Sequence, residues 1–182
     1  MAFSPKPQQS PQKQNRRAGP NERRRRPSSG RPEERSQRSQ EFDHKILSVR
    51  RVTRVVAGGR RFSFSVALVV GNKKGAVGVG LAKASDTSSA IEKATRNARK
   101  NLIRPVTTAL MSIAYPVSAK YSASKVELRP APKSGLVAGS AARHVLELAG
   151  ITDINAKILS RSHNQLNNAR ATIEALRKLS NH

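Results

Sequence analysis

The fold is decided by residues 49–84, which read VRRVTRVVAGGRRFSFSVALVVGNKKGAVGVGLAKA. Two extended runs on either side of Gly58-Gly59 are typical of a β-hairpin. The turn-forming stretch 71–75 predicts a second reversal, and a third strand follows. In that strand Gly78 and Gly80 fall on one face, where small residues permit the close approach of another backbone. The stretch therefore predicts three consecutive antiparallel strands.

A helix is expected directly after these strands. Ser85-Asp86 offers N-cap chemistry, and the helix is predicted to reach about Ile103, with Pro105 as the residue that stops it. Apolar residues recur on one side at helical spacing, and basic residues lie nearly opposite. The basic residues of that outer face are Lys93, Arg96, Lys100 and Arg104.

The second half of the chain predicts another mixed region. We expect a β-rich region around Val106–Tyr115, Val117–Tyr121 and Lys125–Arg129, a helix from about Ala138 to Ala149 closed by Gly150, a strand Ile154–Leu159 and a helix Gln165–Leu179. The order β-β-β-α and then β-β-α-β-α indicates an α+β protein of two small domains. We place the domains at residues 41–105 and 106–182, after a tail at 1–40.

Charge indicates the kind of partner. The 182 residues carry 35 Lys and Arg against 11 Asp and Glu, a formal net charge of +24, and such an excess favours a polyanion. The tail holds eleven basic residues, three acidic residues and six of the ten prolines, so we expect it to be disordered in isolation. It is either a solubilising tail or an arm that orders on RNA phosphates.

Several kinds of protein can be set aside. The chain has no cysteine, which excludes disulfides, Cys-ligated zinc, iron–sulfur clusters and thiol catalysis. Its four histidines lack metal-ligand spacing, so we expect no metal and no cofactor. No apolar run is long enough to span a membrane, and the N-terminus lacks the apolar core of a secretory signal. We therefore expect a cytoplasmic protein without a membrane partner.

Two glycine-containing stretches invite a nucleotide-binding interpretation. The glycines at 75, 78 and 80 fit neither a Rossmann fingerprint, because Lys83 stands at the last position, nor a Walker A loop. Residues 132–142 are similar to the phosphate loop of kinases of the galactokinase–homoserine kinase class. However, the spacing differs, and Glu147 and Asp153 form no evident base and magnesium pair. The same loop could hold an RNA phosphate, and we expect no enzymatic activity.

Residues 42 to about 180 resemble the family of bacterial small-subunit ribosomal protein five. The likeness rests on residues 52–64, 69–84, 90–101, 135–151 and 168–172, taken together and in order. It implies a first domain like double-stranded-RNA-binding domains and a second domain that shares its fold with those kinases, which accounts for the kinase-like loop. A free RNA-binding protein or chaperone on the same fold, or a phosphotransferase, is the alternative.

The resemblance also implies partners. It places the chain on the small ribosomal subunit, bound to 16S ribosomal RNA. Small-subunit ribosomal proteins four and eight would be its neighbours, with protein three nearby where messenger RNA enters. The family is associated with subunit assembly, decoding accuracy and unwinding of the messenger.

Particular residues follow from the same resemblance. Thr53, Arg54, Ala57, Gly58 and Gly59 match the family's hairpin loop beside the spectinomycin site. This chain departs from the family at Ala57, often Lys, at Ala76, often basic, and at Ala82, often Gly. The resemblance implies that the hairpin and the sheet face contact RNA more than the helix does. We therefore rank the basic outer helix lower as a candidate RNA-binding surface.

We expect recognition by phosphate contact and RNA shape rather than by base reading. The predicted contacts to ribosomal RNA are Arg54, Gly58, Gly59, Arg60, Arg61, Lys73, Lys74, Lys83, Lys133 and Arg143.

Overall fold

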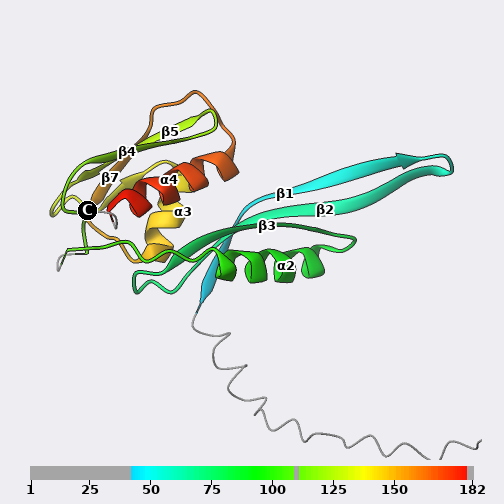
Figure 1. Cartoon of the computed structure of the whole chain (residues 1–182), viewed down its shortest axis with the longest axis horizontal. Coiled ribbons are helices and arrows are strands. Elements are labelled where there is room, and N and C mark those ends of the chain that lie inside the picture. Colours follow the sequence, from blue (N-terminus) through cyan, green and yellow to red (C-terminus); the bar gives the residue numbers. More distant parts are fainter. Residues whose placement is uncertain (1–41, 109–110, 180–182) are drawn as a thin grey trace, which may run out of the picture. The chain divides into compact units, whose positions relative to one another are not determined.

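The computed structural model describes residues 42–108 and 111–179 (Figure 1). The first region contains β1 (Asp43–Val56), β2 (Gly59–Gly71), β3 (Val77–Ala84) and α2 (Thr87–Lys100). The second contains β4 (Val117–Tyr121), β5 (Ser124–Pro130), β6 (Leu136–Ala138), α3 (Ser140–Ala149), β7 (Ile154–Ile158) and α4 (Gln165–Leu179). The predicted α+β fold with two regions is confirmed. The predicted tail, 1–40, lies outside the described residues.

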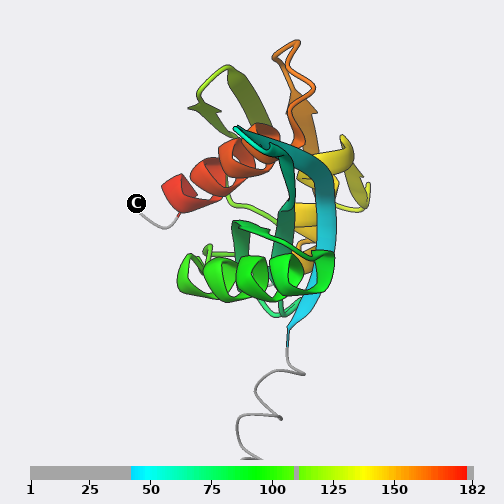
Figure 2. The same cartoon turned by 90° about the vertical axis from the view of Figure 1, so that its right-hand side faces the viewer.

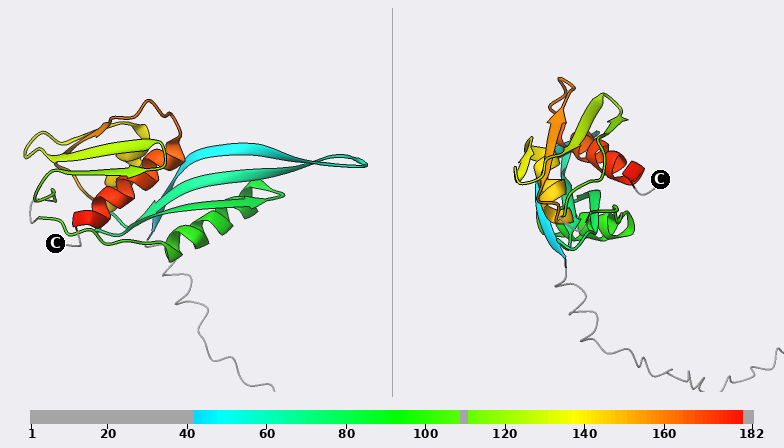
Figure 3. Two further views of the ribbon diagram at one scale, coloured as in Figure 1. Left: turned by 45° about the horizontal axis from the view of Figure 1, so that its top comes forward. Right: turned by 90° about the vertical axis from the view of Figure 1, so that its left-hand side faces the viewer.

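The first sheet is an antiparallel meander in the order β1-β2-β3. Val56 pairs with Gly59, so the two turn residues of the hairpin are Ala57 and Gly58, one position earlier than the Gly-Gly pair suggests. Gly59 has φ +124°, a conformation that L side chains rarely adopt. Pairing between β2 and β3 starts only at Phe64. The hairpin therefore continues beyond β3 as two strands, as the left view of Figure 3 shows.

Helix α2 covers one face of this sheet, and the small residues of β3 explain how closely it packs. A Cβ atom on Gly78 would lie 2.5 Å from the Ala98 carbonyl oxygen, which confirms the predicted close approach. The Asp86 side chain accepts a hydrogen bond from the Ser88 N–H, as expected for an N-cap. The predicted end of the helix is wrong. It stops at Lys100, and Ile103 pairs with Val77 instead, so Pro105 is not what ends it.

The second sheet has the order β4-β5-β7-β6, in which β6 runs parallel to β7. The β structure predicted at 106–115 is wrong for the described residues of that stretch, where only Ser112 forms an isolated bridge, to Asp153. Strand β6 was not predicted. Gly150, with φ +81°, closes α3 as expected. Among the described residues no helix is long and apolar enough to cross a bilayer.

One hydrophobic core joins the two regions. The face of the first sheet opposite α2 carries Ala67, Val69, Val77 and Val79, which pack in the same cluster as residues of α3 and α4. Residues 66–71 of β2 are consecutively buried, because α2 covers one face and α3 and α4 cover the other. The layers are thus α2, the first sheet, α3 with α4, and the second sheet. Figure 2 views this arrangement along the hairpin.

The β2–β3 turn is attached to the end of α3. The Lys73 N–H donates to the Leu148 carbonyl and the Gly75 N–H donates to the Ala149 carbonyl, both at 2.9 Å. Carbonyls in the last turn of a helix lack partners within it, so another element satisfies them here. Gly71 lies so close that an added Cβ would be 2.3 Å from the Leu148 oxygen. The first sheet and α3 are therefore fixed to each other by backbone contacts.

Candidate nucleic-acid interface

The two-stranded extension of the hairpin, residues 52–63, is the part of the first sheet that the other described residues leave uncovered. We call it the arm. It contains three arginines and no acidic residue, and Arg50 and Arg51 lie at its base. All five arginines are exposed. Other described elements cover both faces of the body of the sheet, so the exposed arginines of this sheet are those of the arm and its base.

Strand pairing assigns the arginines to two faces. Arg54 lies directly opposite Arg61, and Arg50 directly opposite Ser65. Because alternate residues of a strand point to opposite sides, these four share one face with Ser63. We call this the arginine–serine face. Lys83 of β3 pairs with Ser65 and extends the same face.

The other side of the arm is more apolar, and we call it the apolar face. It carries Val55, Phe62, Arg51 and Arg60. Val55 is 75% exposed and Phe62 is 48% exposed. The Arg51 guanidinium lies 4.7 Å from the centre of the Phe62 ring, a cation–π contact that holds both side chains against the strand. The predicted contacts Arg60 and Arg61 therefore point in opposite directions.

The charge of the arm is not compensated within the described part of the chain. Each of the four ion pairs found there involves other residues. Arg54 and Arg61 are like charges directly opposite each other, an arrangement that destabilises a hairpin. A polyanion that neutralised both would remove this repulsion and release its own condensed counterions.

The remaining predicted residues lie away from the arm. Lys73 and Lys74 are in the β2–β3 turn, at the other end of β2. The Lys73 ammonium forms an ion pair with Asp43 at 2.6 Å, and its hydrogen bond and charge lower the pKa of that carboxyl. Lys133 and Arg143 are exposed residues of the second region, and Arg143 donates a hydrogen bond to the Leu136 carbonyl. The structure thus brings Arg54, Arg61 and Lys83 together on one face of the first sheet, but it does not bring all the predicted RNA contacts together.

The three departures from the family occupy different environments. Ala57 is an exposed turn residue, so the missing lysine removes a charge from the tip of the arm. Ala76 is 4% exposed, and its N–H donates to the Asn72 side chain within the β2–β3 turn. Ala82 packs against the cluster that α2 forms with the sheet.

Sequence reasoning missed Arg50. Its side chain lines a cavity of about 140 Å³ with Ser48 and Ser65 of the sheet and Asn164 from the loop before α4. That neighbourhood depends on contacts between distant segments. The signal that could have indicated Arg50 is its spacing of four from Arg54, which places both on one face of a strand.

The kinase-like stretch 132–142 has an ordinary structural role. It forms a turn, strand β6 and the first residues of α3, and β6 is hydrogen-bonded to β7. Within the described residues, no group of three His, Asp or Glu side chains could hold a metal ion.

These features define a class, the basic α+β proteins whose exposed, uncompensated positive charge suits a polyanionic partner. Residues 42–105 match the family described as ribosomal protein S5, N-terminal domain, and residues 119–182 match its C-terminal domain. The chain is 48% identical over 141 residues to small ribosomal subunit protein uS5 of Campylobacter jejuni, which covers 77% of this chain and 95% of that protein. It is 47% identical over 140 residues to protein uS5c of Emiliania huxleyi, with 76% of this chain and 87% of that protein covered.

The chain belongs to the ribosomal protein S5 family, as the resemblance predicted. It is a structural component of the small ribosomal subunit, associated with ribosomal RNA, and acts in translation. The family is structural and not enzymatic, which confirms the expectation of no catalysis. The protein is located on the small ribosomal subunit.

Proposed function

We propose that this protein binds 16S ribosomal RNA by phosphate and shape contacts, and that it thereby supports subunit assembly, translational accuracy and the entrance of messenger RNA. The observation that carries the proposal is the arm. Its exposed arginines have no acidic partner in the described part of the chain, while both faces of the adjoining sheet are covered by protein. Uncompensated, exposed positive charge on a projecting element is what phosphate binding requires.

The arginine–serine face provides the phosphate contacts in this proposal. Guanidinium groups bind phosphate oxygens through parallel N–H donors, and serine hydroxyls add further donors. Arg54, Arg61, Lys83 and Arg50 lie on this face and are exposed. Lys74, Lys133 and Arg143 are exposed on other elements and would contact separate RNA segments, so binding requires a folded RNA.

Neighbouring partners follow from membership of the family. We propose contacts with small-subunit ribosomal proteins four and eight, with protein three nearby at the messenger entrance. We also propose that Thr53, Arg54, Ala57 and Gly58 lie next to the spectinomycin site. All four are exposed residues at or near the hairpin turn, where a bound RNA would meet them first.

The test is sedimentation of the tagged full chain from a native lysate after a high-salt wash. We expect the protein to remain with small subunits and 70S-type particles at about one copy each. Release of the protein to the top of the gradient would contradict the proposal and favour a free RNA-binding protein.

A further inference from the structure

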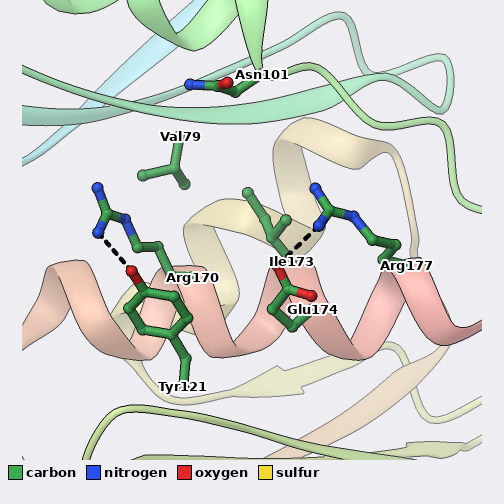
Figure 4. A pocket seen from close by; sticks show the side chains of 7 residues that line it. All are labelled: Val79, Asn101, Tyr121, Arg170, Ile173, Glu174 and Arg177. Carbon is green, nitrogen blue, oxygen red and sulfur yellow. Dashed lines mark hydrogen bonds and ion pairs between the residues drawn. The ribbon is translucent and has the colours of Figure 1, made fainter.

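A second basic site lies between the first sheet and α4, away from the arm. It is a cavity of about 280 Å³ (Figure 4). Arg170, Ile173, Glu174 and Arg177 of α4 line it, together with Val79 of β3 and Tyr121 at the end of β4. Both family domains therefore contribute to its walls. Two guanidinium groups and one carboxylate line it, so the cavity carries a net positive charge.

We propose that this cavity binds a short segment of RNA strand, with phosphates of the strand at Arg170 and Arg177 and the sugars between them against Ile173 and Val79. The inference rests on the proposed function, since it supplies a second contact for the same class of ligand. The cavity lies between β3 and α4 and is separate from the arm.

Arg170 is held in place before any ligand arrives. Its Nη1 donates to the Tyr121 hydroxyl at 2.8 Å, and its guanidinium lies 5.4 Å from the centre of the same ring. A guanidinium has five N–H donors, and this bond uses one. The remaining N–H donors stay in the plane of the guanidinium and can bind phosphate oxygens. A side chain that is already held in position loses less conformational freedom when a ligand binds.

Arg177 can exchange its present partner, Glu174, for a phosphate. Its Nη1 lies 3.0 Å from Glu174 Oε1, and the two side chains are 52% and 38% exposed. An ion pair that is so accessible to water stabilises little, so a phosphate can replace the carboxylate without a large loss. Figure 4 shows both guanidinium groups on the side of α4 that faces Val79 and Asn101.

The spacing of the two arginines selects the ligand. They are seven residues apart on one helix, a separation of about 10 Å along its axis. The apolar Ile173 side chain lies between them in the lining of the cavity. A ligand that fits must carry negative charge at two points with a less polar section between. A nucleic-acid strand has this pattern, with phosphates separated by riboses, whereas inorganic phosphate does not.

Further positive charge lies close to Asn101 in the chain. Lys100 and Arg104 are exposed on either side of Asn101, which lines the cavity. Glu174 is the one acidic residue among those that line it. The chain belongs to a ribosomal protein family, so RNA is the polyanion that surrounds it on the ribosome. We therefore propose RNA as the ligand of this cavity rather than an acidic protein segment.

The test uses the full chain in assembled small subunits. A photoreactive p-benzoylphenylalanine replaces Asn101, an exposed residue that lines the cavity, in the tagged protein, and purified subunits are irradiated. We expect a crosslinked product that nuclease shortens. A crosslink only to protein, or none at all, would overturn the inference.

Charge variants test the inference independently. The measured quantity is the affinity of each variant for small subunits from which this protein has been removed. Arg177→Ala should reduce the slope of log affinity against log salt by about one unit. Glu174→Gln should instead raise the affinity, because it removes the competing carboxylate. Tyr121→Phe, which keeps the ring but not the hydroxyl, should weaken binding without changing the slope.

The inference fails if all three variants bind like the wild type. In that case the wild-type protein would still remain with small subunits after a salt wash, so the proposed function would stand. Arg177 is exposed, and its replacement should leave the thermal midpoint unchanged. If Arg170→Ala does not fold, Arg170→Lys tests the same position with its charge retained.

Discussion

Gly80 marks the point where α2 and the first sheet are closest. An added Cβ would lie 2.1 Å from the Ala94 carbonyl oxygen and 2.8 Å from the Ala98 nitrogen. Both are backbone atoms, so the helix would have to move as a unit. We predict that Gly80→Ala lowers the free energy of unfolding by about 2 kcal/mol or more. Urea unfolding measures this difference.

Gly58 is the matched control for that substitution. It has open space around its Cβ position, and its backbone does not adopt the left-handed region. Gly58→Ala should therefore change the free energy of unfolding by less than about 0.5 kcal/mol. Equal effects of the two substitutions would mean that helix packing does not set the requirement for glycine at position 80.

Glu147 makes stability depend on pH. Its pKa is lowered, mainly by the hydrogen bond from the Lys45 ammonium, with further help from the charges of Lys45, His144 and Lys73. A lowered pKa in the folded state means stabilisation that is present above the unfolded value of about 4.3 and is lost as pH falls through the folded value. Both partners are about 40% exposed, so we expect a contribution below about 1 kcal/mol.

The measurement is the urea midpoint of the wild type and of Glu147→Gln between pH 6 and pH 3. The wild type should be more stable at pH 6, and the difference should vanish at the acidic end. A difference that stayed constant with pH would show that Glu147 stabilises by packing and not by its charge.

The arm is the element whose two faces should behave differently. Arg54→Ala with Arg61→Ala removes two charges from the arginine–serine face, so the slope of log affinity for RNA against log salt should fall by about two units. Phe62→Ala on the apolar face should weaken binding but leave the slope unchanged. Filter binding to ribosomal RNA at several salt concentrations separates the two effects. An unchanged slope in the double variant would remove Arg54 and Arg61 from the phosphate contacts.

Prediction from sequence succeeded for elements whose pattern is local. The alternation in β2, the N-cap at Asp86 and the glycine after α3 each identify a structure from neighbouring residues alone. The same reasoning failed at 106–115, where apolar residues such as Ile113 are buried without forming a strand. It also missed β6, three residues long, because its partner strand comes later in the chain.

The candidate site was predictable in part for the same reason. Charge and turn chemistry indicated the arm and its arginines from a short stretch of sequence. The cavity beside Arg170 and the environment of Arg50 depend on α4 and its preceding loop packing against the first sheet. No local pattern reports such contacts, since they join residues far apart in the chain.

At the scale of the whole molecule, the shared core predicts one cooperative unfolding transition. Leu148 is 1% exposed and lies in the cluster that joins the two regions. Leu148→Ala should lower the free energy of unfolding by about 2–5 kcal/mol while keeping a single transition. Both tyrosines lie in the second region, so tyrosine fluorescence reports on it, and hydrogen exchange of α2 amides reports on the first. Separate midpoints for the two probes would contradict the prediction.

The position of α3 and α4 against the first sheet has a consequence for synthesis of the chain. Strands β1 to β3 and α2 emerge from the ribosome before α3 and α4, and N-terminal segments generally fold first. At that moment Ala67, Val69, Val77 and Val79 have no helix of the second region to cover them, because α3 and α4 are translated later. A nascent chain that stalls before α4 thus displays an apolar sheet face, and it is the form of this protein that a chaperone should recognise.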